Sequence, residues 1–252
     1  GDPKIPGTHH ILATGSKPAH LPHINPDHDK ILDSDSILKL ETIPKSLAVI
    51  GAGAVGVEFG SIFNSFGTEV SIIEMLPHAV PLEDEEISST LERAFKKKKI
   101  NVMTSSTVKS ADATPKGAKL VIEKNGNTTE LEVEKLLVSV GRKPLTADIG
   151  LDAAGVSVDD RGYVDVNEFM QTSVSNIYAI GDIVNTPWLA HVATAEGILA
   201  VDHIAGKAVT PINYDTIPGC TYCSPEVASV GLTEAAAKEK GYDVAVGKFP
   251  FA

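Results

Sequence analysis

The chain has 252 residues, of which 42% are hydrophobic, and a formal net charge of −11 at pH 7, which suits one large or two modest globular domains. The negative charge argues against nucleic acid or an anionic membrane surface as a partner. The sequence contains no run of about 18 apolar residues, which a membrane span would require. Two cysteines are too few for a secreted disulfide scaffold and no signal peptide is recognisable, so we expect a cytoplasmic or organelle-matrix protein.

The first 45 residues predict one strand and a polar connection. Ile11–Ala13 is an apolar run that leads into a glycine turn at Thr14-Gly15-Ser16. Farther on, Asp33 to Ser36 supplies capping residues for a short helix over Ile37–Leu40.

Residues 46–66 predict a strand, a glycine turn and a helix of the kind that binds a dinucleotide. The apolar residues 47–50 suit a buried parallel strand, and Gly51-Ala52-Gly53-Ala54-Val55-Gly56 follows directly. In this pattern Gly51 allows the tight turn, Gly53 lets the backbone approach the pyrophosphate, and Gly56 lets the helix pack close to the strand. The helix N-terminus would hold the pyrophosphate. The alternative is a glycine turn used only for packing.

A second apolar run, Val70 to Ile73, ends in Glu74, about 20 residues beyond the glycines, where the motif requires an acid. A carboxylate there accepts hydrogen bonds from the ribose hydroxyls and repels a 2′-phosphate. The next residues, Met75 to His78, offer no Arg for such a phosphate. The sequence therefore favours NAD over NADP.

The rest of this module follows in order. We expect a helix over residues 83–98, with its acids first and its lysines last, and a strand over 100–103. Asn125-Gly126 predicts a hairpin between residues 119–123 and 130–133. A further strand over 136–140 ends at Gly141, which completes a nucleotide-binding module spanning about 41–146.

Two shorter regions follow the module. Ile177–Ile180 predicts a buried strand that runs into Gly181-Asp182, and His191–Ile204 predicts a helix. Asp182 is placed to bind a ribityl or ribose hydroxyl, although a cap or turn residue is the alternative. Beyond residue 211, a strand over 227–230 and a helix capped by Thr233 are too short to form a domain.

Together these motifs resemble the pyridine nucleotide-disulfide oxidoreductases, and most closely the dihydrolipoamide dehydrogenase branch. The blocks occur in the family's order along nearly the whole chain. They are Ala13-Thr14-Gly15-Ser16, Gly51 to Glu58, Val140-Gly141-Arg142-Lys143-Pro144, Asn176 to Asp182, Leu189-Ala190-His191, Ser224-Pro225-Glu226-Val227-Ala228-Ser229-Val230-Gly231 and Gly247-Lys248-Phe249-Pro250-Phe251.

The resemblance implies an α/β fold, in which a Rossmann-like NAD-binding domain is inserted in a partial FAD-binding domain and followed by the start of an α+β dimerisation domain. The expected limits are 1–40 for the first FAD-binding segment, 41–146 for the NAD-binding domain, 147–210 for the FAD and central segment, and 211–252 for the dimerisation domain.

The resemblance also implies two cofactors, FAD and NAD, and a set of contacts for each. The expected NAD contacts are Gly51, Gly53, Ala54, Val55, Gly56, Glu58, Glu74, Val108 and Gly141. Glu58, in the first turn of the helix, would point toward the nicotinamide end. The expected FAD neighbours are Thr14, Gly15, Ser16, Asp182, Leu189, Ala190 and His191.

The implied activity is FAD-dependent dihydrolipoyl dehydrogenase, which passes electrons from dihydrolipoamide through a disulfide and FAD to NAD. The implied partners are a lipoyl domain of a 2-oxoacid dehydrogenase or glycine cleavage complex and a second copy of the chain, in a bacterial cytoplasm or a mitochondrial matrix. Mercuric or glutathione reductase-like enzymes, a transhydrogenase, or a non-catalytic NAD-binding module are the alternatives.

The chain departs from the family at both ends. It opens on Gly1-Asp2-Pro3 without Met and ends inside a predicted strand over 244–252, so we expect a piece of a longer protein. The family's first glycine motif, its Cys-x4-Cys redox pair and its catalytic His and Glu have no counterpart here. We therefore expect no catalytic residue in this chain, and an inactive isolated fragment.

The cysteines and histidines do not change this interpretation. Cys220 and Cys223 form a Cys-x2-Cys pair, which can be a redox or metal motif. The pair does not lie at a predicted helix N-terminus and no second pair completes a zinc site, so strand residues are favoured over a disulfide or a metal site. The five histidines between residues 9 and 28 lack the spacing of a metal cage, and we expect no metal.

Overall fold

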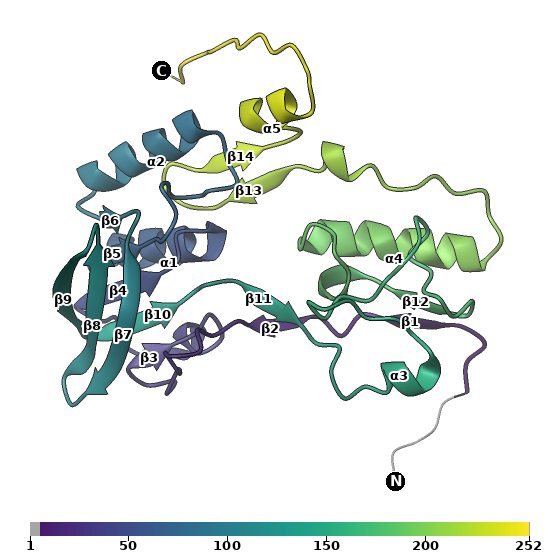
Figure 1. Cartoon of the computed structure of the whole chain (residues 1–252), viewed down its shortest axis with the longest axis horizontal. Helices are drawn as coiled ribbons and strands as arrows, with labels where there is room; N and C mark the ends of the chain where they lie inside the picture. Colours follow the sequence, from purple (N-terminus) through teal and green to yellow (C-terminus); the bar gives the residue numbers. More distant parts are fainter. Residues whose placement is uncertain (1–5, 252) are drawn as a thin grey trace. The chain divides into compact units, whose positions relative to one another are not determined.

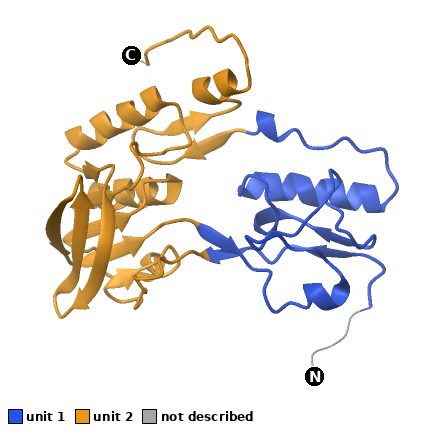
Figure 2. Cartoon of the chain, in the orientation of Figure 1, with its two compact units in different colours: residues 1–17, 142–217 blue, residues 18–141, 218–252 orange. Residues whose placement is uncertain are grey.

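The computed structural model describes residues 6–251, so Gly1-Asp2-Pro3 at the beginning and Ala252 at the end lie outside the described part. Figure 2 shows two compact units. Unit 1 contains the described part of residues 1–17 together with 142–217, and unit 2 contains 18–141 together with the described part of 218–252. Within residues 6–251, no helix has the length and apolar character needed to cross a membrane.

Short strands and helices alternate along the described chain. In order they are β1 (His10–Leu12), β2 (Ser16–Pro18), β3 (Ile31–Leu32), the 3₁₀ helix η1 (Ile37–Lys39), β4 (Ser46–Ile50), α1 (Ala54–Ser65), β5 (Glu69–Ile73), α2 (Glu85–Lys97), β6 (Asn101–Met103), β7 (Thr107–Thr114), β8 (Gly117–Lys124), β9 (Asn127–Val133), β10 (Lys135–Val138), β11 (Arg142–Pro144), α3 (Leu151–Ala154), β12 (Ile177–Ala179), η2 (Gly181–Ile183), α4 (Ala190–Ile204), η3 (Tyr214–Thr216), β13 (Gly219–Thr221), β14 (Val227–Ser229) and α5 (Glu234–Glu239).

Unit 2 is built on a five-stranded parallel sheet in the order β3-β10-β4-β5-β6. The predicted strand-turn-helix-strand is confirmed as β4, α1 and β5, with Ile50 opposite Ile73 at the ends of the two strands. Because the strands are parallel, their carboxyl ends meet at one edge, where ligands bind in open α/β sheets. Figure 1 shows α1 and α2 lying beside this sheet.

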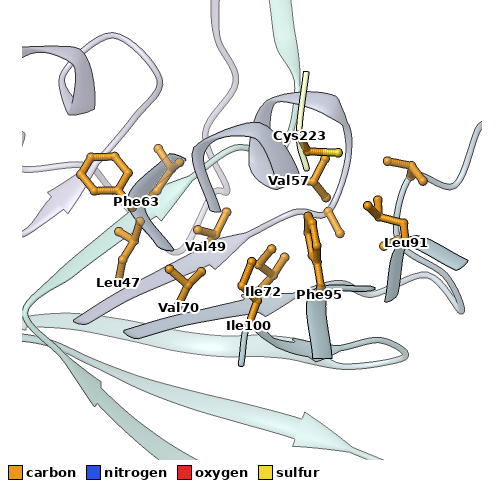
Figure 3. Close-up of a cluster of buried hydrophobic side chains, with 14 of the residues drawn as sticks. Leu47, Val49, Val57, Phe63, Val70, Ile72, Leu91, Phe95, Ile100 and Cys223 are labelled. Atoms are coloured by element: carbon orange, nitrogen blue, oxygen red, sulfur yellow. The ribbon is translucent and has the colours of Figure 1, made fainter. Parts of the chain in front are cut away.

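The sheet is buried on both faces, as parallel sheets usually are. Successive side chains of β4 alternate between two clusters, with Leu47 and Val49 in one and Ala48 and Ile50 in the other. Figure 3 shows the first cluster, in which strand residues pack against side chains of the two helices. Cys223 is part of this cluster, so the segment after β13 contributes to the core.

The second cluster is covered by an antiparallel sheet of three strands, β7-β8-β9. The predicted hairpin is confirmed as β8 and β9, with Lys124 opposite Asn127. Strand β7 is an addition that the sequence analysis did not predict. Along β7 the buried apolar side chains are Val108 and Ala111, which are too few to show the alternation by which strands are recognised.

The two predicted helix caps differ in outcome. Thr233 is confirmed as the cap of α5, because its hydroxyl accepts the Ala236 N–H at 3.1 Å. Near η1 the capping carboxylate is Asp33, whose Oδ1 accepts the N–H groups of Asp35 and Ser36 at 3.1 and 2.8 Å. The side chain of Ser36, at the cap position itself, makes no capping bond.

Unit 1 contains two parallel strands, β1 and β12, with Ile11 opposite Tyr178. Strands β2 and β11 form a separate pair. The helix α4 covers a cluster that includes Tyr178 and Leu199, while Ala179 and Ile183 belong to a second cluster. The 3₁₀ helix η2 begins at Gly181, shortly after the end of β12. The sequence predicts a glycine turn and an acid at this place.

The two units divide the chain differently from the expected domains. We expected residues 1–40 and 41–146 to be separate, but β3 pairs with β10 in the sheet of unit 2, with Leu32 opposite Leu137. Residues 18–40 therefore pack with the module. The same unit also includes residues from 218 onward, since Cys223 and Val227 enter its core.

Candidate functional site

The three glycines of the turn between β4 and α1 are required for different structural reasons. Gly51 has φ +100°, which favours glycine. A Cβ on Gly56 would lie 1.9 Å from the Gly51 carbonyl oxygen, so packing alone requires that glycine. A Cβ on Gly53 would meet no atom within 4 Å. Since packing does not require Gly53, its place at the start of α1 fits the close approach of a ligand.

Glu74 holds the backbone of this turn. Its side chain follows β5 directly and the residue is 7% exposed. One carboxylate oxygen accepts the Ala52 N–H at 2.7 Å, and the other accepts the Leu76 N–H at 2.8 Å. A carboxylate has about four lone-pair positions, so ribose hydroxyls can be accepted in addition. Glu74 therefore positions the turn as well as offering the predicted acid.

The remaining predicted NAD contacts also lie in unit 2. Ala54 and Val55 begin α1 and are exposed. Gly141 has φ +106°, and a Cβ there would meet nothing within 4 Å. Val108 is 4% exposed and its side chain belongs to the core, so a cofactor contact from this residue would come from its backbone.

Glu58 is the fifth residue of α1, which begins at Ala54, so it lies just beyond the first turn in which it was predicted. Its Oε1 accepts the N–H of Tyr222 at 2.7 Å. On the same helix, the Ser61 hydroxyl accepts the N–H of Ser224 at 3.1 Å. The segment after β13 is thus bound to the helix that carries Glu58, a contact that the sequence analysis did not predict.

Two predicted FAD neighbours that are far apart in the sequence, Ser16 and Asp182, are hydrogen-bonded to each other. The Ser16 hydroxyl donates to Asp182 Oδ2 at 2.5 Å and accepts from Arg142 Nε at 2.7 Å. A second guanidinium nitrogen of Arg142 donates to the Ser16 carbonyl at 2.8 Å. Asp182 is half-buried, so the arrangement fixes a carboxylate that can still accept a hydroxyl.

The turn before Asp182 is fixed by a buried carboxylate. Glu196 of α4 is 0% exposed, and its Oε2 accepts the Gly181 N–H at 2.7 Å. Its Oε1 accepts the Tyr214 hydroxyl proton at 3.0 Å. Burial, together with the negative charge of Glu196, raises the pKa of the Tyr214 phenol well above its usual range. The phenol therefore remains a hydrogen-bond donor at neutral pH.

The other predicted FAD neighbours belong to the same unit. The Thr14 hydroxyl donates to the Leu145 carbonyl at 2.6 Å, and Gly15 has φ +75°. Leu189 is the N-cap of α4, and Ala190 and His191 form its exposed first turn. Unit 1 thus brings the predicted FAD set onto two turns and one helix end.

The described residues contain no group of three or more His, Cys, Asp or Glu side chains that could hold a metal ion. Both cysteines are free thiols. Cys220 belongs to β13, while burial raises the pKa of the Cys223 thiol to about 11. A thiol with this pKa is protonated at neutral pH and is a poor nucleophile.

Arg142 and Glu196 were missed as site residues, although the sequence carried a signal for each. Arg142 directly follows Gly141 at the end of a predicted strand, where a cation is unusual in a buried element. Glu196 lies four residues after Val192 on the buried side of α4. An acid on the apolar stripe of a helix indicates a paired or hydrogen-bonded group.

Comparison with known proteins identifies two families along the chain. Residues 2–197 match the family described as pyridine nucleotide-disulphide oxidoreductase. Residues 217–252 match the dimerisation domain of the same oxidoreductases. Both matches follow the order of the predicted blocks.

Curated relatives of similar sequence include dihydrolipoyl dehydrogenases and leghemoglobin reductases. The chain is 43% identical over 249 residues to a mitochondrial dihydrolipoyl dehydrogenase of Pisum sativum, covering 98% of this chain and 50% of the relative. It is 43% identical over 243 residues to the dihydrolipoyl dehydrogenase of Bacillus subtilis, covering 96% and 51%. A leghemoglobin reductase of Glycine max is 42% identical over 249 residues, covering 98% and 47%. The chain spans about half the length of these relatives.

Solved structures agree with this result and confirm the predicted fold class. LpdA from Mycobacterium tuberculosis matches with a TM-score of 0.84 at 29% identity, over 91% of this chain and 50% of that one. The HOCl-induced flavoprotein disulfide reductase RclA from Escherichia coli matches with a TM-score of 0.84 at 25% identity, over 95% and 55%. The chain therefore belongs to the pyridine nucleotide-disulphide oxidoreductase family.

Proposed function

We propose that the chain is part of an FAD- and NAD-dependent dihydrolipoyl dehydrogenase and carries the NAD site and part of the FAD site. The observation that carries the proposal is the 43% identity to proteins of that name along nearly the whole chain. The reaction would pass electrons from dihydrolipoamide through a redox disulfide and FAD to NAD, which accepts them as a hydride. The proposal assigns the segments around 41–146 to NAD, 1–40 and 147–210 to FAD, and 211–252 to dimerisation, although residues 18–40 and those from 218 onward pack in the same unit as the NAD segment.

The residues of unit 2 suit the NAD role. The exposed N-terminus of α1 presents free N–H groups and the positive end of the helix dipole to a pyrophosphate. Gly53 leaves the space in front of that terminus open. Glu74, with Ala52 and Leu76 bound to its oxygens, would accept ribose hydroxyls and repel a 2′-phosphate.

The residues of unit 1 suit part of a flavin site. Asp182 would accept a ribityl hydroxyl, while Ser16 and Arg142 orient its carboxylate. Thr14, Gly15 and the Leu189–His191 segment would lie beside the flavin. In these assignments the chain's own residues bind and orient the cofactor, and none of them exchanges a proton with substrate.

The proposal extends to partners and location. The dimerisation-domain match at residues 217–252 supports a homodimer of the full-length protein. A lipoyl domain of a 2-oxoacid dehydrogenase or glycine cleavage complex would deliver the dihydrolipoamide. Relatives named from a plant mitochondrion and from a bacterium support a mitochondrial matrix or a bacterial cytoplasm.

The direct test is a titration of the purified chain with NADH, NADPH and FAD, followed by fluorescence. We expect binding of NADH in the micromolar to millimolar range, weaker binding of NADPH and poor binding of FAD. Gly53→Ala should abolish NADH binding without changing stability, because the added Cβ meets no protein atom and occupies the open space. Equal affinity for NADH and NADPH, or full binding in Gly53→Ala, would contradict the proposed NAD site.

The isolated chain should show no dihydrolipoamide:NAD turnover when FAD is supplied. The Cys223 thiol lies in the core of unit 2, where burial raises its pKa to about 11. It is therefore not suited to exchange electrons with dihydrolipoamide. The assay follows NADH formation, with a relative of full length as the positive control. Turnover that is lost in Cys223→Ser would refute this expectation and assign the chain a redox thiol.

A further inference from the structure

Val80 has a strained backbone and is hydrogen-bonded to the glycine turn, but it is not one of the residues of the proposed NAD site. Its φ is +43°, and it is 4% exposed. A β-branched residue in the left-handed region is an outlier, because its side chain crowds the backbone there. Such strain persists only where the surroundings fix the conformation, and it gathers at functional sites.

The contacts of Val80 lead directly to the glycine turn. Its N–H donates to the carbonyl of Ala52 at 2.8 Å. Ala52 is the residue between Gly51 and Gly53, and its own N–H is bound by Glu74. Both backbone polar groups of Ala52 are therefore occupied, one by an acid and the other by the strained residue, so the peptide planes of the turn are fixed.

Two side chains of helix α2 form hydrogen bonds with the backbone of Ala79 and Val80. Glu92 Oε1 accepts the N–H of Ala79 at 2.9 Å, and the Ser88 hydroxyl donates to the carbonyl of Val80 at 3.3 Å. Ser88 and Glu92 are four residues apart and thus lie on one side of the helix. Ala79 is 0% exposed, so in this structure its N–H is shielded from water and has Glu92 as its acceptor.

We propose that Glu92 is a positioning residue for the pyrophosphate of NAD, acting through Ala79 and Val80 on the carbonyl of Ala52. This inference rests on the proposed NAD site. A carboxylate on α2 would thereby set the direction of the turn's N–H groups, which must converge on an anion before it arrives. The role concerns the pyrophosphate and not the adenosine, whose ribose would meet Glu74.

The test compares two ligands, NADH and adenosine, on a set of variants at α2. In Glu92→Ala the dissociation constant for NADH should rise about 3- to 10-fold, the range expected for one lost hydrogen bond. The dissociation constant for adenosine, measured by NMR, should remain unchanged. Glu92→Gln keeps an oxygen for the Ala79 N–H and should restore NADH affinity. Glu86→Ala removes the same charge from the exposed side of α2 and serves as the control.

Glu92→Asp covers the case in which Glu92→Ala fails to fold, since it keeps the charge but is too short to reach Ala79. It should weaken NADH to the same degree. The inference is overturned if folded Glu92→Asp or Glu92→Ala binds NADH as tightly as the wild type, if adenosine weakens equally, or if Glu86→Ala has the same effect. Absence of NADH binding in the wild-type chain would instead overturn the NAD site itself, and this inference with it.

Discussion

Replacing Glu74 by Ala should affect both the stability of unit 2 and its affinity for NADH. The substitution removes the acceptor of the N–H of Ala52, a residue that is 0% exposed, and the acceptor of the N–H of Leu76, which is 43% exposed. A hydrogen bond to a charged group contributes about 1.5–3 kcal/mol to stability. The free energy of unfolding should therefore fall by at least about 1.5 kcal/mol. The loss of ribose contacts should weaken NADH by about 1–3 kcal/mol, or about 5- to 140-fold in dissociation constant.

The assay measures NADH and NADPH affinity by fluorescence titration and the free energy of unfolding by urea, at one temperature. The ratio of the NADPH to the NADH dissociation constant should fall in Glu74→Ala, because the carboxylate that repels a 2′-phosphate is absent. Glu69→Ala, at the other end of β5, is the matched control. An NADH affinity within about twofold of wild type in a folded Glu74→Ala protein would refute the role of this carboxylate.

Three further predictions concern Gly56, the two cysteines and Asp33. Gly56→Ala should lower the free energy of unfolding by about 1–3 kcal/mol, since its Cβ would lie 1.9 Å from the Gly51 carbonyl oxygen; an unchanged urea midpoint would contradict this. Iodoacetamide should label Cys220 much faster than Cys223, because burial raises the pKa of the Cys223 thiol to about 11, and peptide mapping that finds equal labelling would refute it. Burial alone would raise the pKa of Asp33, but hydrogen bonds from the following backbone and a serine hydroxyl lower it below its usual value. The stability that Asp33 contributes is therefore present above about pH 4 and lost as the pH falls through the folded-state pKa. The difference in unfolding free energy between wild type and Asp33→Asn should shrink in acid, and a difference independent of pH would contradict the assignment.

The strand-turn-helix at Ser46 to Phe66 was predictable because the signals that indicate it lie close together in the sequence. A short apolar strand, three spaced glycines and an acid at Glu74 each restrict the backbone within a few residues. The edge strand β3 could not be predicted in this way. It has two residues, Ile31 and Leu32, and becomes a strand only because β10 offers a pairing edge more than 100 residues later.

The side-chain contacts that fix the site were equally out of reach of the sequence. Glu92 contacts Ala79, and Glu58 contacts Tyr222, through bonds to backbone N–H groups that carry no residue identity. A motif specifies side chains at fixed spacing, whereas these acceptors need only a backbone group that the fold brings within reach. For this reason the glycines and Glu74 were predicted, while the residues behind them emerged only from the structure.

The two units use the same device at their predicted cofactor turns. In unit 2 the buried carboxylate of Glu74 accepts the N–H of Ala52, and in unit 1 that of Glu196 accepts the N–H of Gly181. Burying a charge is costly unless the charged group is hydrogen-bonded. A turn that contains glycine is conformationally flexible unless its N–H groups are hydrogen-bonded. Each arrangement resolves both problems at once, because the acid gains its partners from the turn that it rigidifies. The turns are consequently ordered before a ligand binds, which lowers the entropy lost on binding.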